Sequence, residues 1–179
     1  MMNKIFLLVL AMLFFVGCKS PEARKPISVK TGSFIDASVE RNKKLNAREQ
    51  AEIQKILSEK KIDYLSSQSG FWYYYNIKTD VDSLKTPSFG NIINFNYDVK
   101  TLDGATIYSK EDLKTQSYAM DQEEIFTGLR EGLKLMKTGE TVTFLFPSQK
   151  AYGYYGDQNK IGTNVPLICE VTVNSISEK

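Results

Sequence analysis

The spacing of hydrophobic residues changes once along the chain. In the first part, residues 33–62 repeat apolar side chains at helical intervals, most clearly at Ile53 and Leu57. Asn46 followed three residues later by Glu49 resembles a helix start, so this segment is either one kinked helix or two short helices. We therefore predict a helical segment in front of the second part of the chain.

The second part alternates apolar and polar residues, which is typical of β-strands. The predicted strands are FWYYYNI, NIINFNYDVK, ATIYS, SYAM, TVTFLFP and PLICEVTVNSI. Asp103-Gly104 predicts a hairpin between the second and third of them. Residues 121–136 predict a single amphipathic helix with an acidic first turn, because Ile125 and Leu129 fall on one side of it. This pattern predicts an α+β domain whose antiparallel sheet buries one face on the helix.

The first residues predict an export signal. Lys4 precedes an apolar run at residues 5–16, which is too short for a membrane span of ~20 residues. Gly17 followed by Cys18 resembles a bacterial lipobox, which predicts cleavage after Gly17 and attachment of lipid to Cys18. The alternative is an ordinary secretory signal with an incidental cysteine.

The residues after this signal are polar, contain two prolines and lack periodicity, so they predict a tether. We divide the chain into a signal peptide (1–17), a lipidated tether (18–32), a helical segment (33–66) and a strand-rich domain (67–179).

Charge is unevenly distributed between the two parts of the chain. Residues 19–61 carry 11 Lys/Arg against 6 Asp/Glu, a net charge of +5, whereas residues 62–179 carry 11 against 15, a net charge of −4. A solvated helix face explains the basic excess, and the alternative is a segment that lies against anionic lipid beside the anchor. The basic residues lack interleaved aromatic residues, so we expect no nucleic-acid partner.

The chain contains no histidine, which excludes Ser-His-Asp and Cys-His catalysis and His-ligated zinc. We therefore expect no metal and no cofactor. Cys18 and Cys169 allow one disulfide, but acylation of Cys18 leaves Cys169 as a single thiol.

The strand-rich domain contains four informative stretches, which are NFNYDVKTLDGATIYS, EEIFTGLREGLKLMKTGETVTFLFP, QKAYGYYG and IGTNVPLICEVTVNSI, in that order. Together they resemble the FK506-binding-protein (FKBP) type of peptidyl-prolyl cis-trans isomerase. The resemblance covers roughly residues 90–176 and is strongest to FKBP-type lipoproteins associated with gliding motility. It implies an FKBP-like antiparallel half-barrel sheet wrapped around one short helix at 123–136, an apolar pocket between them, and an isomerase domain at 67–179.

The resemblance also assigns residues to this pocket. The catalytic positions are Tyr97, Tyr108 and Tyr152, of which Tyr152 matches a loop tyrosine that hydrogen bonds a substrate carbonyl. The substrate-binding positions are Ile107, Ile125, Phe126, Leu129, Ile161 and Cys169. Tyr108 stands where the family commonly has an aspartate at the pocket rim, and Cys169 stands where it usually has a phenylalanine. Gly162-Thr163 replaces a Pro-Pro pair of the family, so the resemblance does not fix the catalytic rate of this pocket.

The resemblance implies a prolyl isomerase that is anchored in the cell envelope through Cys18, faces the periplasm and assists the folding of exported proteins, including gliding-machinery proteins. Its expected partners are proline-containing clients, the membrane and an FK506-like macrolide. The alternative is a peptide-binding chaperone or motility-apparatus component with little turnover. The sequence leaves open which membrane holds the anchor and whether the chain is a monomer or a dimer through residues 33–62.

Overall fold

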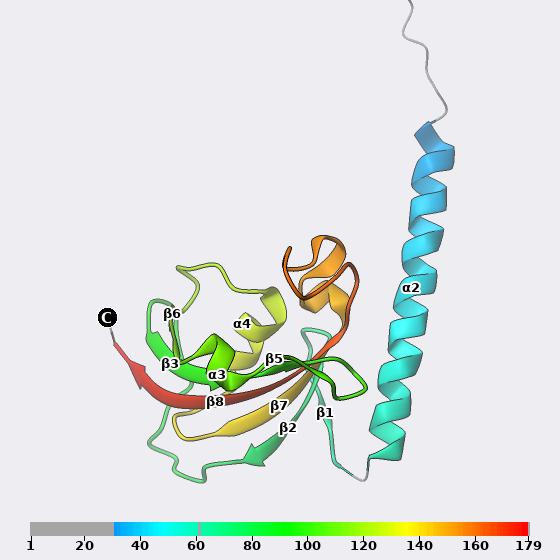
Figure 1. Cartoon of the computed structure of the whole chain (residues 1–179). Coiled ribbons are helices and arrows are strands. Elements are labelled where there is room, and N and C mark those ends of the chain that lie inside the picture. Colours follow the sequence, from blue (N-terminus) through cyan, green and yellow to red (C-terminus); the bar gives the residue numbers. More distant parts are fainter. Residues whose placement is uncertain (1–30, 61, 179) are drawn as a thin grey trace, which may run out of the picture. The chain divides into compact units, whose positions relative to one another are not determined.

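The computed structural model describes residues 31–60 and 62–178 (Figure 1). The predicted signal peptide, Cys18 and most of the predicted tether lie outside these residues. The chain divides into two compact units, and the second unit, residues 39–179, holds the sheet.

The elements follow one another along the chain in an order close to that predicted. The helices are α2 (Thr31–Glu59), α3 (Lys110–Leu113) and α4 (Thr127–Leu133), and the 3₁₀ turns are η1 (Ser148–Lys150) and η2 (Gly153–Tyr155). The strands are β1 (Leu65–Ser66), β2 (Trp72–Ile77), β3 (Ile92–Tyr97), β4 (Val99–Lys100), β5 (Thr106–Tyr108), β6 (Gln116–Ala119), β7 (Thr141–Phe146) and β8 (Leu167–Ser177).

Helix α2 is one continuous helix, so the two-helix alternative is wrong. Asn46 and Glu49 lie in its interior and do not start a second helix. Ile53 is fully buried with Leu145 of β7 and Ile168 of β8, which explains why apolar residues recur at helical spacing here.

The strands form one antiparallel sheet with the order β1-β2-β7-β8-β3-β6, and β4 pairs with both β5 and β8. The predicted hairpin at Asp103-Gly104 is confirmed, because it joins β4 to β5. In β3, Ile93, Phe95 and Tyr97 are buried while the residues between them are only partly covered. This alternation confirms the predicted face and directs a row of aromatic rings toward one side of the sheet.

Helix α4 packs on the curved sheet through two glycines (Figure 1). A Cβ atom on Gly128 would lie 2.5 Å from the ring of Phe146, and one on Gly132 would lie 2.9 Å from the ring of Phe144. The two phenylalanine rings are stacked, with centroids 5.3 Å apart. The helix therefore reaches the rings of β7 only because both positions lack a side chain.

The start of this helix differs from the prediction. The helix begins at Thr127, and its N-cap Phe126 has extended backbone angles, so the expected acidic first turn within residues 121–136 is wrong. The Glu123 carboxylate instead accepts the backbone N–H of Ala119 at 3.0 Å, which holds the preceding residues in a turn. The extended conformation brings Phe126 into contact with Phe146 and Tyr152.

Candidate active site

A cavity of about 350 Å³ opens between β3, β6, the segment before α4 and the loop after η1. Six of its ten lining residues are aromatic or aliphatic, and the other four are polar or acidic. It is lined by Phe95, Tyr97, Gln116, Ser117, Tyr118, Glu123, Glu124, Ile125, Phe126 and Tyr152.

Three elements hold the aromatic wall of this cavity in place. Phe95 and Tyr97 are two residues apart on β3, and their rings lie 5.5 Å apart. Phe126 packs edge-on against Phe146 at 5.4 Å and also contacts the ring of Tyr152 at 5.1 Å. Each ring therefore has a neighbour that limits its rotation.

Tyr97 and Tyr152 each direct a phenol toward this region. Burial, together with neighbouring ionisable groups, raises the pKa of Tyr152 to about 12 and raises that of Tyr97 above its ordinary value. Both hydroxyls therefore keep their protons at neutral pH. Among the described residues, no protein group hydrogen bonds to either hydroxyl, so both donors remain open to a ligand.

Four of the predicted site residues line the cavity: Tyr97, Ile125, Phe126 and Tyr152. Others lie behind it, because Leu129, Ile161 and Cys169 are buried in the main hydrophobic core. Cys169 is a free thiol, and its complete burial raises its pKa.

Ile107 and Tyr108 do not line the cavity but are partly buried against the same core. The Tyr108 hydroxyl donates to Asp157 Oδ2 at 2.5 Å. Tyr108 is therefore engaged with the loop that follows Tyr152, and Asp157 supplies a carboxylate beside it.

The predictions missed several cavity residues. Phe95 could have been found, since it lies on the same face of its strand as Tyr97. Gln116 on β6 and the pair Glu123–Glu124 carried no comparable signal, because their placement depends on the turn before α4.

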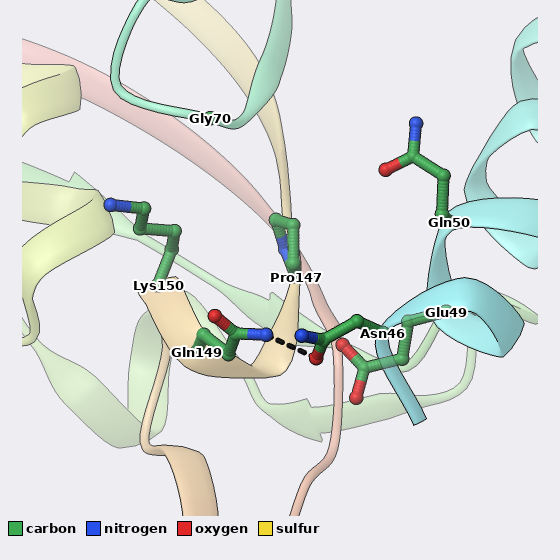
Figure 2. Close-up of a pocket in the computed structure, with 7 residues that line it drawn as sticks. All are labelled: Asn46, Glu49, Gln50, Gly70, Pro147, Gln149 and Lys150. Atoms are coloured by element: carbon green, nitrogen blue, oxygen red, sulfur yellow. Dashed lines mark hydrogen bonds between the residues drawn. The ribbon is translucent and has the colours of Figure 1, made fainter. Parts of the chain in front are cut away.

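A second, polar cavity of about 230 Å³ lies between α2 and the residues after β7 (Figure 2). Asn46, Glu49 and Gln50 line it on one side and Pro147, Gln149 and Lys150 on the other. Figure 2 shows the hydrogen bond from Gln149 to Asn46 that crosses it. It contributes no aromatic wall and is separate from the cavity at Tyr152.

Among the described residues, no three His, Cys, Asp or Glu side chains gather in a group suited to a metal ion. Within the same residues, every helix is too short or too polar to cross a bilayer.

Comparison with known proteins agrees with this geometry. The model of the family described as FKBP-type peptidyl-prolyl cis-trans isomerase matches residues 84–174. The probable FKBP-type peptidyl-prolyl cis-trans isomerase FkpA of Neisseria meningitidis serogroup B is 29% identical over 92 residues, which are 51% of this chain. The match spans 34% of that relative, or about a third of its length.

Two solved structures share the fold. A peptidyl-prolyl cis-trans isomerase from Pseudomonas syringae pv. tomato superposes with a TM-score of 0.59 at 21% identity, covering 74% of this chain and 96% of that chain. FkpA from Escherichia coli superposes with a TM-score of 0.61 at 20% identity, covering 98% of this chain and 82% of that chain. The predicted α+β fold with an antiparallel sheet and an N-terminal helix is confirmed, and the chain belongs to the family of FKBP-type peptidyl-prolyl cis-trans isomerases.

Proposed function

We propose that this chain is a peptidyl-prolyl cis-trans isomerase that is anchored in the cell envelope and assists the folding of exported proteins. The observation that carries the catalytic part is the cavity with aromatic side chains in its wall and with the hydroxyls of Tyr97 and Tyr152 open to a ligand. Family membership gives the reaction class.

The reaction requires neither a base nor a nucleophile. Rotation about an X-Pro bond is slow because amide resonance must be broken, at a barrier of ~18–20 kcal/mol. The planar amide is more dipolar than the twisted one, so transfer into a dry cavity destabilises the ground state more than the transition state. A chain without histidine is compatible with this chemistry.

Different cavity residues exclude water and bind the peptide. Phe126 and Ile125 present apolar surface to the proline ring and exclude water, and Phe95 supports the wall from the core behind them. The Tyr152 hydroxyl, protonated at neutral pH, donates a hydrogen bond to a substrate carbonyl and fixes the peptide in the cavity. A fixed peptide with a desolvated amide rotates about the X-Pro bond more readily than the same peptide in water.

An exchange assay by NMR on a short Xaa-Pro peptide tests the activity. We expect the chain to accelerate cis–trans exchange and a macrolide of the FK506 class to suppress that acceleration. Unaccelerated exchange at saturating peptide would refute the proposed activity.

Anchoring rests on Gly17-Cys18 and on the basic residues that follow it in the sequence. We expect metabolic labelling with palmitate to mark the wild-type chain in the envelope fraction and to leave Cys18→Ser unlabelled. Retained label in Cys18→Ser would exclude Cys18 as the acceptor. Binding of residues 19–61 to vesicles that contain anionic lipid, but not to neutral vesicles, would support contact with the membrane surface.

Clients in the gliding machinery are proposed on the resemblance of the four sequence stretches alone. A strain that carries Tyr152→Phe should then lose gliding speed while keeping normal levels of the protein. Normal gliding in that strain, with isomerase activity reduced, would exclude a role of turnover in motility.

A peptide-binding chaperone with little turnover is a second candidate. It is favoured by Tyr154 and Tyr155, whose side chains are 70% and 81% exposed beside Tyr152 and lie edge-to-face at 5.4 Å. Exposed aromatic rings of this kind bind unfolded chains. Suppression of client aggregation that survives Tyr152→Phe but is lost in a Tyr154→Ser, Tyr155→Ser variant would support this candidate.

A further inference from the structure

The Asp157 carboxylate holds part of the loop that carries Tyr152 in a compact turn. Asp157 Oδ1 accepts the backbone N–H groups of Asn159 at 2.9 Å and Ile161 at 2.7 Å. The backbone N–H of Asp157 donates to the Ile161 carbonyl at 3.1 Å. Three hydrogen bonds to one residue thus fold residues 157–161 into a compact turn that delivers Ile161 to the core.

This turn needs such support because its backbone is unusual. Gln158 has a positive φ of 61°, a conformation that costs energy in a residue with a Cβ atom. Gly156 also has a positive φ, of 64°, and a Cβ atom there would lie 2.2 Å from the Ile161 carbonyl oxygen. The loop therefore depends on the contacts that surround it.

The second carboxylate oxygen ties the turn to the sheet. Asp157 Oδ2 accepts the Tyr108 hydroxyl at 2.5 Å, and Tyr108 ends strand β5. Lys160 covers the other side of this contact, with its ammonium 4.7 Å from the centre of the Tyr108 ring and 3.3 Å from the Ile107 carbonyl oxygen. Tyr108, Asp157 and Lys160 thus form a latch between β5 and the loop.

The latch lies beside the cavity and shares elements with it. Ile161 is 3% exposed and packs in the core that also contains Tyr97. The backbone N–H of Asn164 donates to the Gly153 carbonyl at 2.8 Å, so both ends of the loop are fixed next to Tyr152. Opening the latch would therefore free the chain on both sides of the turn and move Tyr152 relative to β3.

We propose that Asp157 is a positioning residue for the isomerase site, which acts through the loop rather than on the substrate. This inference rests on the proposed activity. Asparagine at this position can keep every contact, because its Oδ1 still accepts both backbone N–H groups and its amide can pair with the Tyr108 hydroxyl. Alanine removes all of them.

The test compares Asp157→Ala, Asp157→Asn and Tyr108→Phe with the wild-type chain. The control is Glu111→Ala, which removes an exposed carboxylate from neighbouring helix α3. We expect Asp157→Ala to lower kcat/KM for a prolyl peptide roughly tenfold to a hundredfold, since small displacements of positioning groups have effects of this size. Asp157→Asn and Glu111→Ala should stay near wild type, and Tyr108→Phe should fall between them and Asp157→Ala.

Two results would overturn the proposal. If Asp157→Asn loses as much activity as Asp157→Ala at unchanged melting temperature, the charge acts directly and not through the loop. If Asp157→Ala keeps full activity, the latch is irrelevant to the site.

Hydrogen exchange of the Ile161 amide provides a readout that does not depend on turnover. We expect faster exchange in Asp157→Ala than in the wild-type chain, and unchanged exchange there would contradict the proposal even if the wild-type chain proved inactive. An inactive wild-type chain with a protected Ile161 amide would instead refute only the proposed activity.

Discussion

Glu49 of helix α2 and Ser148 lie 99 residues apart in the sequence and are joined by two hydrogen bonds. The Glu49 carboxylate accepts the Ser148 backbone N–H at 2.9 Å and its hydroxyl at 2.6 Å. Both residues are buried, at 4% and 0% exposure. This pair fastens the helix to the residues that lead from β7 into the loop of Tyr152.

Replacing Glu49 by alanine should destabilise the domain. It leaves the Ser148 N–H and hydroxyl buried without a partner, at a cost of about 1–3 kcal/mol. The matched control is Glu52→Ala on the same helix, which breaks only an exposed pair with Arg48 and should cost less than about 1 kcal/mol. Denaturant unfolding measures both variants, and equal losses would mean that the buried pair adds nothing.

Alanine at Gly128 should destabilise the packing of α4. The new Cβ would lie 2.5 Å from the Phe146 ring and 2.6 Å from the Lys150 carbonyl oxygen, and overpacking of this kind costs about 1–3 kcal/mol. A gain of up to about 1 kcal/mol in helix propensity opposes it. Gly162→Ala is the control, because its nearest neighbour would be 3.9 Å away on Val165. A lower melting temperature in Gly128→Ala alone is the expected result.

Removing the hydroxyl of Tyr152 should weaken peptide binding without unfolding the chain. Tyr152→Phe keeps the ring against Phe126 and loses one donor, which is worth ~1 kcal/mol. Tyr154→Phe serves as control, since that side chain is 70% exposed. Titration with a prolyl peptide or macrolide checks the difference, and identical affinities of Tyr152→Phe and wild type would mean that the hydroxyl is idle.

Cys169 should make stability sensitive to alkaline pH. Burial raises the pKa of its thiol above the ordinary value of 9.0, so the folded chain holds the proton more tightly than the unfolded chain. Its contribution to stability is complete below that ordinary value and is lost as the pH rises above it, because the unfolded thiol then ionises. When the pH is raised from about 8 to about 10, the free energy of unfolding should therefore fall less in Cys169→Ala than in the wild-type chain.

Thermal melts at several pH values measure this slope. Iodoacetamide offers an independent check in a Cys18→Ser chain, where we expect alkylation only after denaturation. Rapid alkylation of the native chain, or parallel pH profiles of the two proteins, would contradict the assigned burial of this thiol.

The strands were predictable because apolar and polar residues alternate along a strand that has one buried face. Phe95 and Tyr97 illustrate this, since both were assigned to the face that is buried. The first residue of α4 could not be predicted from the sequence, because Ile125 continues the apolar spacing of the helix. In the structure, the Glu123 carboxylate accepts the Ala119 N–H, and the helix starts only at Thr127.

Helix α3 was missed because four residues are too few to show periodicity. Its capping box, in which Ser109 and Asp112 exchange hydrogen bonds, was visible in the sequence but is a weak signal alone.

The resemblance to the FKBP type assigned Tyr97, Ile125, Phe126 and Tyr152 to the site, and all four line the cavity. Three of them lie on or beside a strand or helix, whereas Tyr152 lies on a loop. The contact of Tyr108 with Asp157 could not be predicted from the sequence, because it depends on how a loop with four positive-φ residues returns to β5. Loop geometry of this kind is set by tertiary contacts rather than by local pattern.

Strand β8 pairs with β3, β4 and β7, although it is the last of the described strands in the sequence. During synthesis, the earlier strands therefore lack their central partner until residues 167–177 have emerged, and the aromatic rings of β7 have no completed sheet to cover them. The sheet can therefore be completed only after nearly all of the described chain has been synthesised.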